Sequence, residues 1–453
     1  MASDRATVGG GRPRLTAPLR HRDFRLLWTG MTVSLLGDGI TLIALAWQAY
    51  EISHAPGALA VIGVSQTVPA VVLLLVGGAV SDRFDRRKVM MAADALRMLS
   101  VFALGALSLA GVIQIWHMMA IAACYGAGTA FFSPAFDAVV PELVPEDELT
   151  QANALDQFVR PAVFRMLGPA IGGWLIAAMG GRPGGAFLVD GLTFLVSIAC
   201  LLSIRGTAGD SRTPEDGSSM LGEIREGLRY VRGRVWLWGT FLAATLAYLV
   251  FWGPAEVLLP YLVKVEMGRS AGELGLVFAL GGIGAMFAAV VMSRRDTPRR
   301  HMTFMYACWT VSTLMVAGYG LARFPWQLMV ASFVFNALES AGLVVWMTTK
   351  QRFVPGRLLG RVSSLDWCIS IGLIPASFAI TGPIAQAFGA RATLVVAGVL
   401  GAAITLAFLF LPGMRDIERQ KPVATPEDME SAAAAGPVSG AGRARTPVPL
   451  QAP

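Results

Sequence analysis

The stretch Gly78-Ala79-Val80-Ser81-Asp82-Arg83-Phe84-Asp85-Arg86-Arg87-Lys88 joins two long apolar segments of the chain. Gly78 would let a neighbouring helix approach closely, because it has no side chain. Asp82 could accept hydrogen bonds from the N-terminus of a neighbouring helix. The basic residues would hold such a loop on the cytoplasmic side of a membrane. The stretch therefore predicts a short polar loop between two helices that span a bilayer.

The composition of the whole chain also indicates a membrane protein. Its 453 residues are 55% hydrophobic and 15% charged, whereas soluble domains carry about 25% charged residues. The chain cannot bury so much apolar surface behind its own polar shell, which excludes an ordinary soluble enzyme and a disordered protein. The net charge is +7, and the charged residues lie mostly in short loops. They therefore indicate the orientation of the chain in the membrane, and we expect no nucleic-acid partner.

Twelve apolar segments are each long enough to span a lipid bilayer, which takes about 20 residues. They lie at approximately 24–50, 57–80, 89–111, 117–140, 155–179, 184–204, 236–262, 272–293, 302–321, 326–349, 363–387 and 392–412. We expect an all-α integral membrane protein with five parts. These are a cytoplasmic N-terminal segment (1–23), a six-helix bundle (24–204), a cytoplasmic linker (205–235), a second six-helix bundle (236–412) and a disordered cytoplasmic tail (413–453).

The distribution of positive charge predicts the orientation of the chain. Most of the 37 Lys and Arg residues lie on the cytoplasmic side if both termini are there. The residues left on the other side are Arg182, Lys264, Arg269, Arg323 and Arg391. The first apolar segment, from Phe24, is too long for the core of a signal peptide. We predict a multi-pass protein of the inner (plasma) membrane, surrounded by lipid, with both termini in the cytoplasm.

The two halves of the chain resemble one another at an offset of about 210 residues, which indicates an internal duplication. The matched positions are Leu27-Trp28-Thr29 with Leu237-Trp238-Gly239, Leu143-Val144-Pro145 with Phe353-Val354-Pro355, and Met179-Gly180-Gly181-Arg182 with Phe388-Gly389-Ala390-Arg391. Two such bundles, related by a pseudo-two-fold axis along the membrane normal, build a transporter with a central cavity.

The loop at residues 78–88 resembles the G-x-x-x-D-R-x-G-R-R loop of the major facilitator superfamily, with Asp85 in place of the family's second Gly. In that family the loop latches one bundle to the other in the outward-facing state. The resemblance implies a conformational latch made of Gly78, Asp82, Arg83, Arg86 and Arg87. The alternative is a plain loop held inside by its positive charge.

The fifth segment contains Gly168-Pro169-Ala170-Ile171-Gly172-Gly173, which resembles the G-P-x-x-G-G end of a motif associated with antiporters. Proline removes a backbone donor and the glycines thin the helix, so Gly168, Pro169, Gly172 and Gly173 form a helix-bending motif that suits a rocking helix. The preceding family Gly is replaced by Phe164, and small residues are common in membrane helices in any case.

The fourth segment points to one branch of the superfamily and departs from another. Ala122 stands ahead of Tyr125-Gly126-Ala127-Gly128, where drug-proton antiporters have an Arg, so the usual coupling Arg is missing. The stretches 132–136, 141–149 and 152–154 resemble the drug and siderophore exporter branch, which includes enterobactin exporters and Tap-type multidrug pumps. This resemblance covers roughly residues 19–413 and favours export over uptake.

Acidic residues inside the apolar segments are candidates for proton coupling, because a charge at the bilayer centre costs at least about 2.5 to 3.5 kcal/mol. Asp38 lies 14 residues, or about 21 Å, along the helix from Phe24, and is the strongest candidate. Glu339 and Glu256 follow, because carboxylates near aromatic rings would attract a lipophilic cation. For Asp38 the alternative is an acid satisfied structurally by a neighbouring helix.

Other intramembrane polar residues have weaker cases. We interpret Asp190 and Asp366 as helix caps or interface residues, and expect Asp94 and Arg97 to form a structural ion pair with the Arg83–Lys88 loop. Polar and aromatic residues near the deep acids are candidates to line the cavity. They are Gln66, Arg165, Trp252, Asn336, Trp346 and Trp367.

Cysteine and histidine give no sign of a cofactor or of catalytic chemistry. Cys124, Cys200, Cys308 and Cys368 lie in apolar runs without paired spacing, so we expect no disulfide and no metal site. The four His residues lie at loops or segment ends. Neither an H-E-x-x-H nor a phosphate-binding motif is present, which argues against a membrane-embedded enzyme.

The resemblance implies a secondary active transporter that exports a small amphipathic compound, such as a drug, antibiotic or siderophore, by alternating access. A proton from outside would neutralise Asp38 or Glu339, substrate would leave, and the two bundles would rock. We expect proton antiport, a monomer and no cofactor. The alternative within the fold is a metabolite or sugar uptake carrier, and a passive channel or receptor is the alternative outside it.

Overall fold

The computed structural model describes residues 16–145, 148–205, 220–294 and 298–419. Residues 420–453 of the predicted disordered tail lie outside these ranges, as do most of the N-terminal segment and the middle of the linker. The first residues of that tail, 413–419, are ordered, because Met414 and Ile417 are buried in the core of the second half of the chain. In lipid a spanning segment must satisfy its backbone polar groups internally, so the long apolar runs form helices. Within the described ranges, eleven helices are long and apolar enough to cross a membrane, and the apolar stretch Ala58–Leu74 begins a twelfth.

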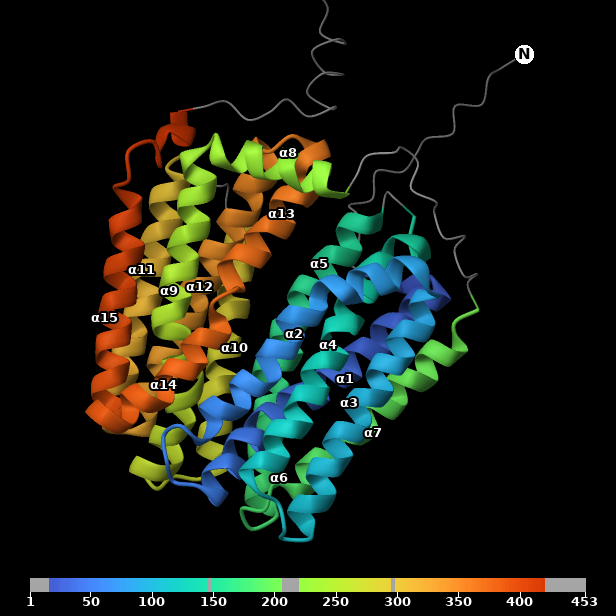
Figure 1. The fold of residues 1–453 in the computed structure, drawn as a ribbon, viewed down its shortest axis with the longest axis vertical. Helices are drawn as coiled ribbons and strands as arrows, with labels where there is room; N and C mark the ends of the chain where they lie inside the picture. The colour runs from blue at the N-terminus through green and yellow to red at the C-terminus, as the bar shows by residue number, and fades with distance from the viewer. Residues whose placement is uncertain (1–15, 146–147, 206–219, 295–297, 420–453) are drawn as a thin grey trace, which may run out of the picture.

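The predicted all-α fold with twelve spans in two bundles is therefore confirmed (Figure 1). The N bundle contains α1 (Arg22–Ile52), α2 (Ala58–Arg83), α3 (Arg86–Leu109), α4 (Ile115–Leu143), α5 (Leu149–Arg160), η3 (Pro161–Leu167), α6 (Gly168–Ala178) and α7 (Gly184–Ser203). The C bundle contains α9 (Val235–Tyr261), η4 (Leu262–Glu266), α10 (Ala271–Ser293), α11 (His301–Leu321), α12 (Pro325–Phe353), α13 (Gly356–Ile371), α14 (Ile374–Phe388) and α15 (Ala390–Leu409). Short 3-10 turns, η1 (Ala17–Arg20) and η5 (Asp416–Arg419), flank the bundles.

The fifth span of each bundle is interrupted at corresponding places. In the N bundle, α5 and α6 are separated by the π-helical segment η3, which begins at Pro161. In the C bundle, α13 ends at Ile371 and α14 begins at Ile374, just before Pro375. A proline supplies no backbone N–H, so the regular hydrogen-bond ladder breaks where it stands. Both spans start earlier than the sequence predicts, at Leu149 and Gly356.

The spans run between two ends of the molecule, which we call the terminal end and the far end. The terminal end carries the first residue of α1 and the last of α15, and the far end carries Ile52 and the α6–α7 turn. Helix α8 (Met220–Arg232), which falls in the expected linker, lies across the C bundle at the terminal end (Figure 1). Glu226 of α8 forms an ion pair with Arg361 of α13.

The two bundles meet toward the far end and separate toward the terminal end (Figure 1). Helix α2 packs against α14, and α6 with η3 packs against α10. At the far end, the buried hydroxyl of Tyr50 in α1 donates to the carbonyl of Val257 in α9 at 2.7 Å. Lys264 of η4 contacts Glu51 of α1 at 2.5 Å and lies 4.3 Å from the centre of the Trp47 ring. These contacts close the far end of the interface.

Candidate functional site

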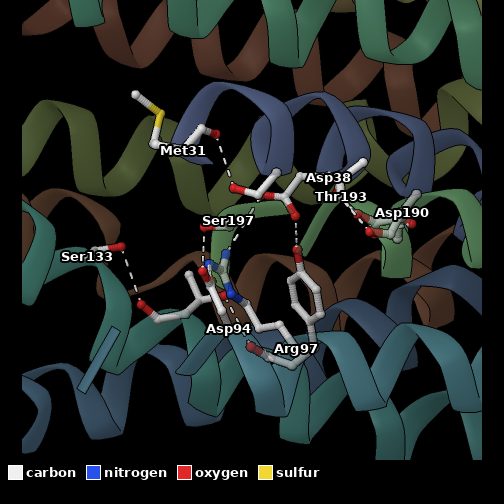
Figure 2. Close-up of polar contacts among 12 residues, drawn as sticks. Met31, Asp38, Asp94, Arg97, Ser133, Asp190, Thr193 and Ser197 are labelled. Atoms are coloured by element: carbon white, nitrogen blue, oxygen red, sulfur yellow. Dashed lines mark hydrogen bonds and ion pairs between the residues drawn. The ribbon is translucent and has the colours of Figure 1, made fainter. Parts of the chain in front are cut away.

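A cluster of charged side chains lies inside the N bundle (Figure 2). We call it the Asp38 cluster and define it by Asp38 of α1, Asp94 and Arg97 of α3, Tyr125 of α4 and Asp190 of α7. Asp38 is 16 residues, or about 24 Å, from the start of α1. Arg97 is 11 residues, or about 16 Å, from the start of α3. Since the hydrocarbon core is about 30 Å thick, both residues lie well inside it.

Asp38 has two partners from neighbouring helices. The hydroxyl of Tyr125 donates a hydrogen bond to Asp38 Oδ1. Arg97 Nη1 lies 3.8 Å from Asp38 Oδ2. Arg97 also forms an ion pair with Asp94, and Ser197 Oγ of α7 donates to Asp94 Oδ2 at 2.6 Å. A network of polar contacts thus runs from α1 through α3 to α7 in the centre of the bundle.

The expectation that Asp94 and Arg97 pair with the Arg83–Lys88 loop is wrong. Both side chains face the bundle interior, where the guanidinium of Arg97 lies 4.4 Å from the Phe132 ring centre. Arg97 is 4% exposed and Asp94 is fully buried. The physical reason is the start of α3 at Arg86, three residues before the predicted segment, which places Arg97 deeper in the membrane. Arg97 lies beside Asp38, although no Arg is present on the fourth segment.

Asp190 is fully buried and belongs to the same cluster, rather than capping a helix. Thr41 Oγ1 of α1 donates to Asp190 Oδ2 at 2.6 Å. Thr193 Oγ1 lies 3.2 Å from Asp190 Oδ1. Gly37 makes the contact possible, because a Cβ on that residue would lie 3.0 Å from the Asp190 carboxyl carbon and closer still to Oδ1. The glycine that precedes Asp38 thereby admits a third acid, after Asp38 and Asp94, to the cluster.

Glu339 of α12 lies beside a small cavity inside the C bundle. The cavity measures about 30 Å³, and its lining includes Tyr248, Phe251, Trp309 and Thr313. The hydroxyls of Tyr248 and Ser312 interact with the Glu339 carboxylate, and the charge of Arg165 acts on it from η3 of the other bundle. A charge of the N bundle thus acts on an acid of the C bundle.

The other predicted cavity residues lie at several places. Arg165 and Asn336 are half-buried, and Asn336 Nδ2 donates to Ser332 O at 2.9 Å. The Trp252 ring centre lies 5.1 Å from that of Tyr248, which places Trp252 near the Glu339 cavity. Gln66 is half-buried on α2, where it packs against Gly126 of α4. Glu256 is half-buried on α9, and its charge acts on Tyr319.

The expected cavity position of Trp346 is not met in this structure, and that of Trp367 stays a prediction. Trp346 is buried within the C bundle, and its Nε1 donates to Asp366 Oδ2 at 2.8 Å. Lys350 Nζ lies 2.6 Å from the same oxygen, and Ser370 Oγ donates to Asp366 Oδ1 at 3.0 Å. Trp367 is 60% exposed. Asp366 is therefore the acceptor of a buried structural cluster, and it orients Trp346 toward itself.

The predicted latch residues make contacts inside the N bundle. Arg86 Nη1 donates to Ala138 O at 3.0 Å and also binds Glu142, and Arg87 Nη1 donates to Ile204 O at 2.5 Å. Arg83 is exposed at the end of α2, and the Asp82 side chain lies outside the described residues. Asp85 caps α3 by accepting from the backbone N–H of Arg87 at 3.0 Å. The aspartate that replaces the family's Gly therefore begins the next helix.

The expected close approach at Gly78 is not met in this structure, because the space around it is open. Its neighbour Gly77 makes the approach instead, against Ala130 O of α4.

The Gly168–Gly173 motif lies between two packing partners. A Cβ on Gly168 would lie 2.6 Å from Gly39 Cα, and one on Gly172 would lie 2.9 Å from Ile40 O, both in α1. A Cβ on Gly173 would lie 2.5 Å from Ala271 O of α10, and Pro169 O packs against Gly275 of the same helix. The helix irregularity itself lies one turn earlier, in η3. The motif thus provides close packing both within the N bundle and between the bundles.

Sequence reasoning missed Tyr125 and Lys350 as partners and underrated Arg97 and Asp190. A signal was available for the last two, because each is charged and lies well inside an apolar segment. No comparable signal existed for Tyr125, whose role depends on the packing of α4 against α1. Lys350 stands near the end of its apolar segment, where a lysine ordinarily reaches the membrane surface.

Comparisons with known proteins agree with this architecture. The multidrug efflux pump Tap of Mycolicibacterium fortuitum is 28% identical over 410 residues, which are 87% of this chain and 96% of that protein. Macrolide efflux protein A of Streptococcus pyogenes is 25% identical over 237 residues, which are 52% of this chain and 58% of that protein. A bacterial homologue of the iron transporter ferroportin, solved in the inward-facing state, has a TM-score of 0.64 at 16% identity, covering 86% of this chain and 99% of that one.

The likeness to the solved structure concerns the fold alone, and the family follows from the sequence matches. A family model described as "Transmembrane secretion effector" matches residues 14–439, which is nearly the whole chain. The resemblance of the 78–88 loop to the major facilitator superfamily is thereby confirmed. The chain belongs to the transmembrane secretion effector family of major facilitator superfamily transporters.

Proposed function

We propose that this transporter exports a small amphipathic organic compound, such as a drug, antibiotic or siderophore, in exchange for protons. The observation that carries the proposal is the position of Asp38. Its carboxylate lies at membrane depth between Tyr125 and Arg97, and its side chain retains 15% exposure. An acid that is costly to bury and still accessible suits a group that binds and releases a proton in each cycle. The names of the relatives support the direction of transport.

The direction of closure fits one stage of alternating access. With both termini in the cytoplasm, the far end faces outward, and its contacts at Tyr50 and Lys264 shut the outside. A proton that reached Asp38 or Glu339 from outside would weaken binding of substrate in the outward-open state, because it removes a negative charge. The bundles would then rock back, with the 78–88 loop (Gly78, Asp82, Arg83, Arg86 and Arg87) as the latch of the opposite state and the Gly168–Gly173 motif as the packed pivot.

The test uses a probe that wild-type cells exclude, chosen from ethidium, Hoechst 33342 and erythromycin. Lower accumulation with the protein than without it indicates export, and higher accumulation of metabolites indicates uptake. If the wild type excludes none of the three, export of amphipathic compounds is contradicted.

Proteoliposomes loaded at acidic pH then measure coupling, because outward proton flow should drive saturable uptake of the same probe. We expect the Asp38→Asn variant to lose nearly all uptake driven by the pH gradient and to keep exchange of labelled for unlabelled probe. Asp416→Asn, an exposed acid of η5, is the matched control. Equal gradient-driven uptake by wild type and Asp38→Asn would remove Asp38 from the coupling step, and non-saturating flux would indicate a channel.

A further inference from the structure

The Asp38 cluster contains more acids than the base in contact with it can neutralise. Three carboxylates, those of Asp38, Asp94 and Asp190, come from three different helices. Arg97 contacts the first two, so full ionisation would leave two negative charges uncompensated within the cluster. An uncompensated charge at membrane depth costs at least about 2.5 to 3.5 kcal/mol. The cluster must therefore hold protons on some of its acids.

The contacts of the three acids distinguish them. Asp94 is directly paired with Arg97 and accepts a second bond from Ser197, so its negative charge is compensated. Asp38 accepts from Tyr125 and has Arg97 at 3.8 Å. Asp190 is fully buried, and among the described residues no cation lies within ion-pair distance of it. The groups that act on it are Asp38 and Thr41 of α1, Arg97 of α3, Tyr125 of α4 and its own neighbour Thr193.

The hydroxyls around Asp190 fit a neutral carboxylic acid. Thr41 Oγ1 donates to Oδ2, which can act as the carbonyl oxygen. Thr193 Oγ1 already donates to the backbone carbonyl of Asp190 at 2.7 Å. Its single hydrogen is thereby engaged, so at 3.2 Å it is placed to accept a hydrogen bond from a protonated Oδ1. While that hydrogen is on the carbonyl, Oδ1 of an ionised Asp190 would receive no donor from Thr193, and Thr41 would donate to Oδ2 alone.

From this geometry we infer that Asp190 is a second proton-carrying acid, neutral while Asp38 is ionised, and that the two acids exchange a proton during the cycle. The inference rests on the proposed proton antiport. In the exchange, the O–H bond at Asp190 Oδ1 breaks and an O–H bond forms on the Asp38 carboxylate. Asp190 becomes ionised and the net charge of the cluster does not change. Gly37 permits this, because its lack of a Cβ leaves room for the Asp190 carboxyl group of α7 against α1, at the position next to Asp38.

Asp190 also lies on the side of the cluster from which outside protons would come. A pocket of about 730 Å³ opens at the far end of the N bundle, lined by Gln48, Ser108 and Gly184, among others. Asp190 is six residues, or about 9 Å, along α7 from Gly184. Ala44 and Phe187, which come between the pocket residues and the cluster along α1 and α7, are fully buried. A proton that enters from the far end would reach Asp190 before Asp38.

Infrared difference spectroscopy of the protein in lipid nanodiscs tests this without any substrate. A protonated carboxylic acid has a carbonyl band that ionised acids lack and that shifts in heavy water. We expect the wild type to show this band at neutral pH, Asp190→Asn to lose about one carboxyl group's share of it, and Asp38→Asn and the exposed control Asp416→Asn to retain it. An Asp190→Asn spectrum that equals the wild-type spectrum would overturn the inference.

A second variant keeps the test decisive if Asp190→Asn does not fold. Thr41→Val has nearly the same shape but removes the hydroxyl that donates to Asp190 Oδ2. Weaker hydrogen bonding stiffens the carbonyl, so the band should move to higher frequency, and an unmoved band would count against Asp190 as its source. Because the band is measured without transport, this result is separate from the flux measured with Asp38→Asn. If probe transport is independent of the pH gradient and the carbonyl band is lost in Asp190→Asn, proton antiport is contradicted while the protonation of Asp190 stands.

Discussion

The N bundle and the C bundle bury charge in opposite ways. In the N bundle, Arg97 contacts two acids and a third, Asp190, has hydroxyl partners. In the C bundle, Lys350 and Asp366 pair one to one at 2.6 Å, and Trp346 and Ser370 complete the carboxylate's hydrogen bonds. The first cluster has more acids than the cation in contact with them, whereas the second has one of each.

Under the proposed proton antiport, this difference would give the Asp38 cluster a switching role and the Lys350–Asp366 pair a structural one. A balanced buried pair gains nothing from taking up a proton, so it can remain fixed while the bundles rock. An excess of acids changes its charge whenever a proton arrives. Glu339 is intermediate, because it is half-buried in the C bundle and the charge of Arg165 in the N bundle acts on it. The comparison predicts that mutations in the two clusters will have different effects. Mutations in the Asp38 cluster should impair proton coupling, and mutations in the Lys350–Asp366 pair should impair folding stability.

The largest expected effect on stability is at Lys350. Lys350→Met leaves Asp366 as a buried unpaired charge, which should lower the free energy of unfolding by about 3–5 kcal/mol. The double variant Lys350→Met/Asp366→Asn removes both charges and should recover most of that loss. Thermal unfolding of the detergent-purified proteins measures both. A double variant as unstable as the single one would show that the pair is not the balanced unit described above.

A smaller effect is expected at Glu339, and it should appear in transport. Glu339→Gln removes one charge beside Tyr248 and Arg165, and the loss of one charged contact worth about 1.4 kcal/mol lowers the affinity for a cationic probe about tenfold. The half-buried acid Glu256 is the matched comparison, because Glu256→Gln carries the same change in the same bundle. Ethidium uptake as a function of concentration gives both KM values. Equal changes in the two variants would remove the distinction between these acids.

Much of this architecture could be predicted from the sequence, because the bilayer forces each apolar run into a helix whatever its neighbours are. The spans and the depth of Asp38 follow from segment length and helix geometry, and the duplication follows from the matched positions in the two halves. The partners of Asp38 could not be predicted in the same way. Tyr125 reaches it only because α4 packs beside α1, and Arg97 was misplaced because three residues were missing from the predicted start of its helix.

The same limit explains the errors at Trp346 and Gly78. Trp346 is near acidic and polar residues in sequence, but whether an indole faces a cavity or a buried carboxylate depends on the rotation of α12. Gly78 and Gly77 are adjacent, and the direction of α4 determines which of them makes the close contact. Sequence spacing predicts how deep a residue lies in the membrane. It does not predict the rotation of a helix about its axis, which depends on tertiary packing.

The smallest expected effect is at the far end, where an ion pair links the two bundles. The charge pair and the acids considered above each lie within one bundle. Glu51 of the Lys264–Glu51 pair is 59% exposed, and exposed pairs contribute about 0.2–1 kcal/mol. Lys264→Met should therefore shift the population toward the state open at the far end by no more than about fivefold. Arg269→Met is the matched control, because Arg269 pairs with Glu273 within the C bundle. Spin labels on exposed positions of α1 and η4 would report the shift as a larger population of long label-to-label distances. An equal shift in both variants would mean that the loss of surface charge, and not this bridge between the bundles, sets the conformational balance.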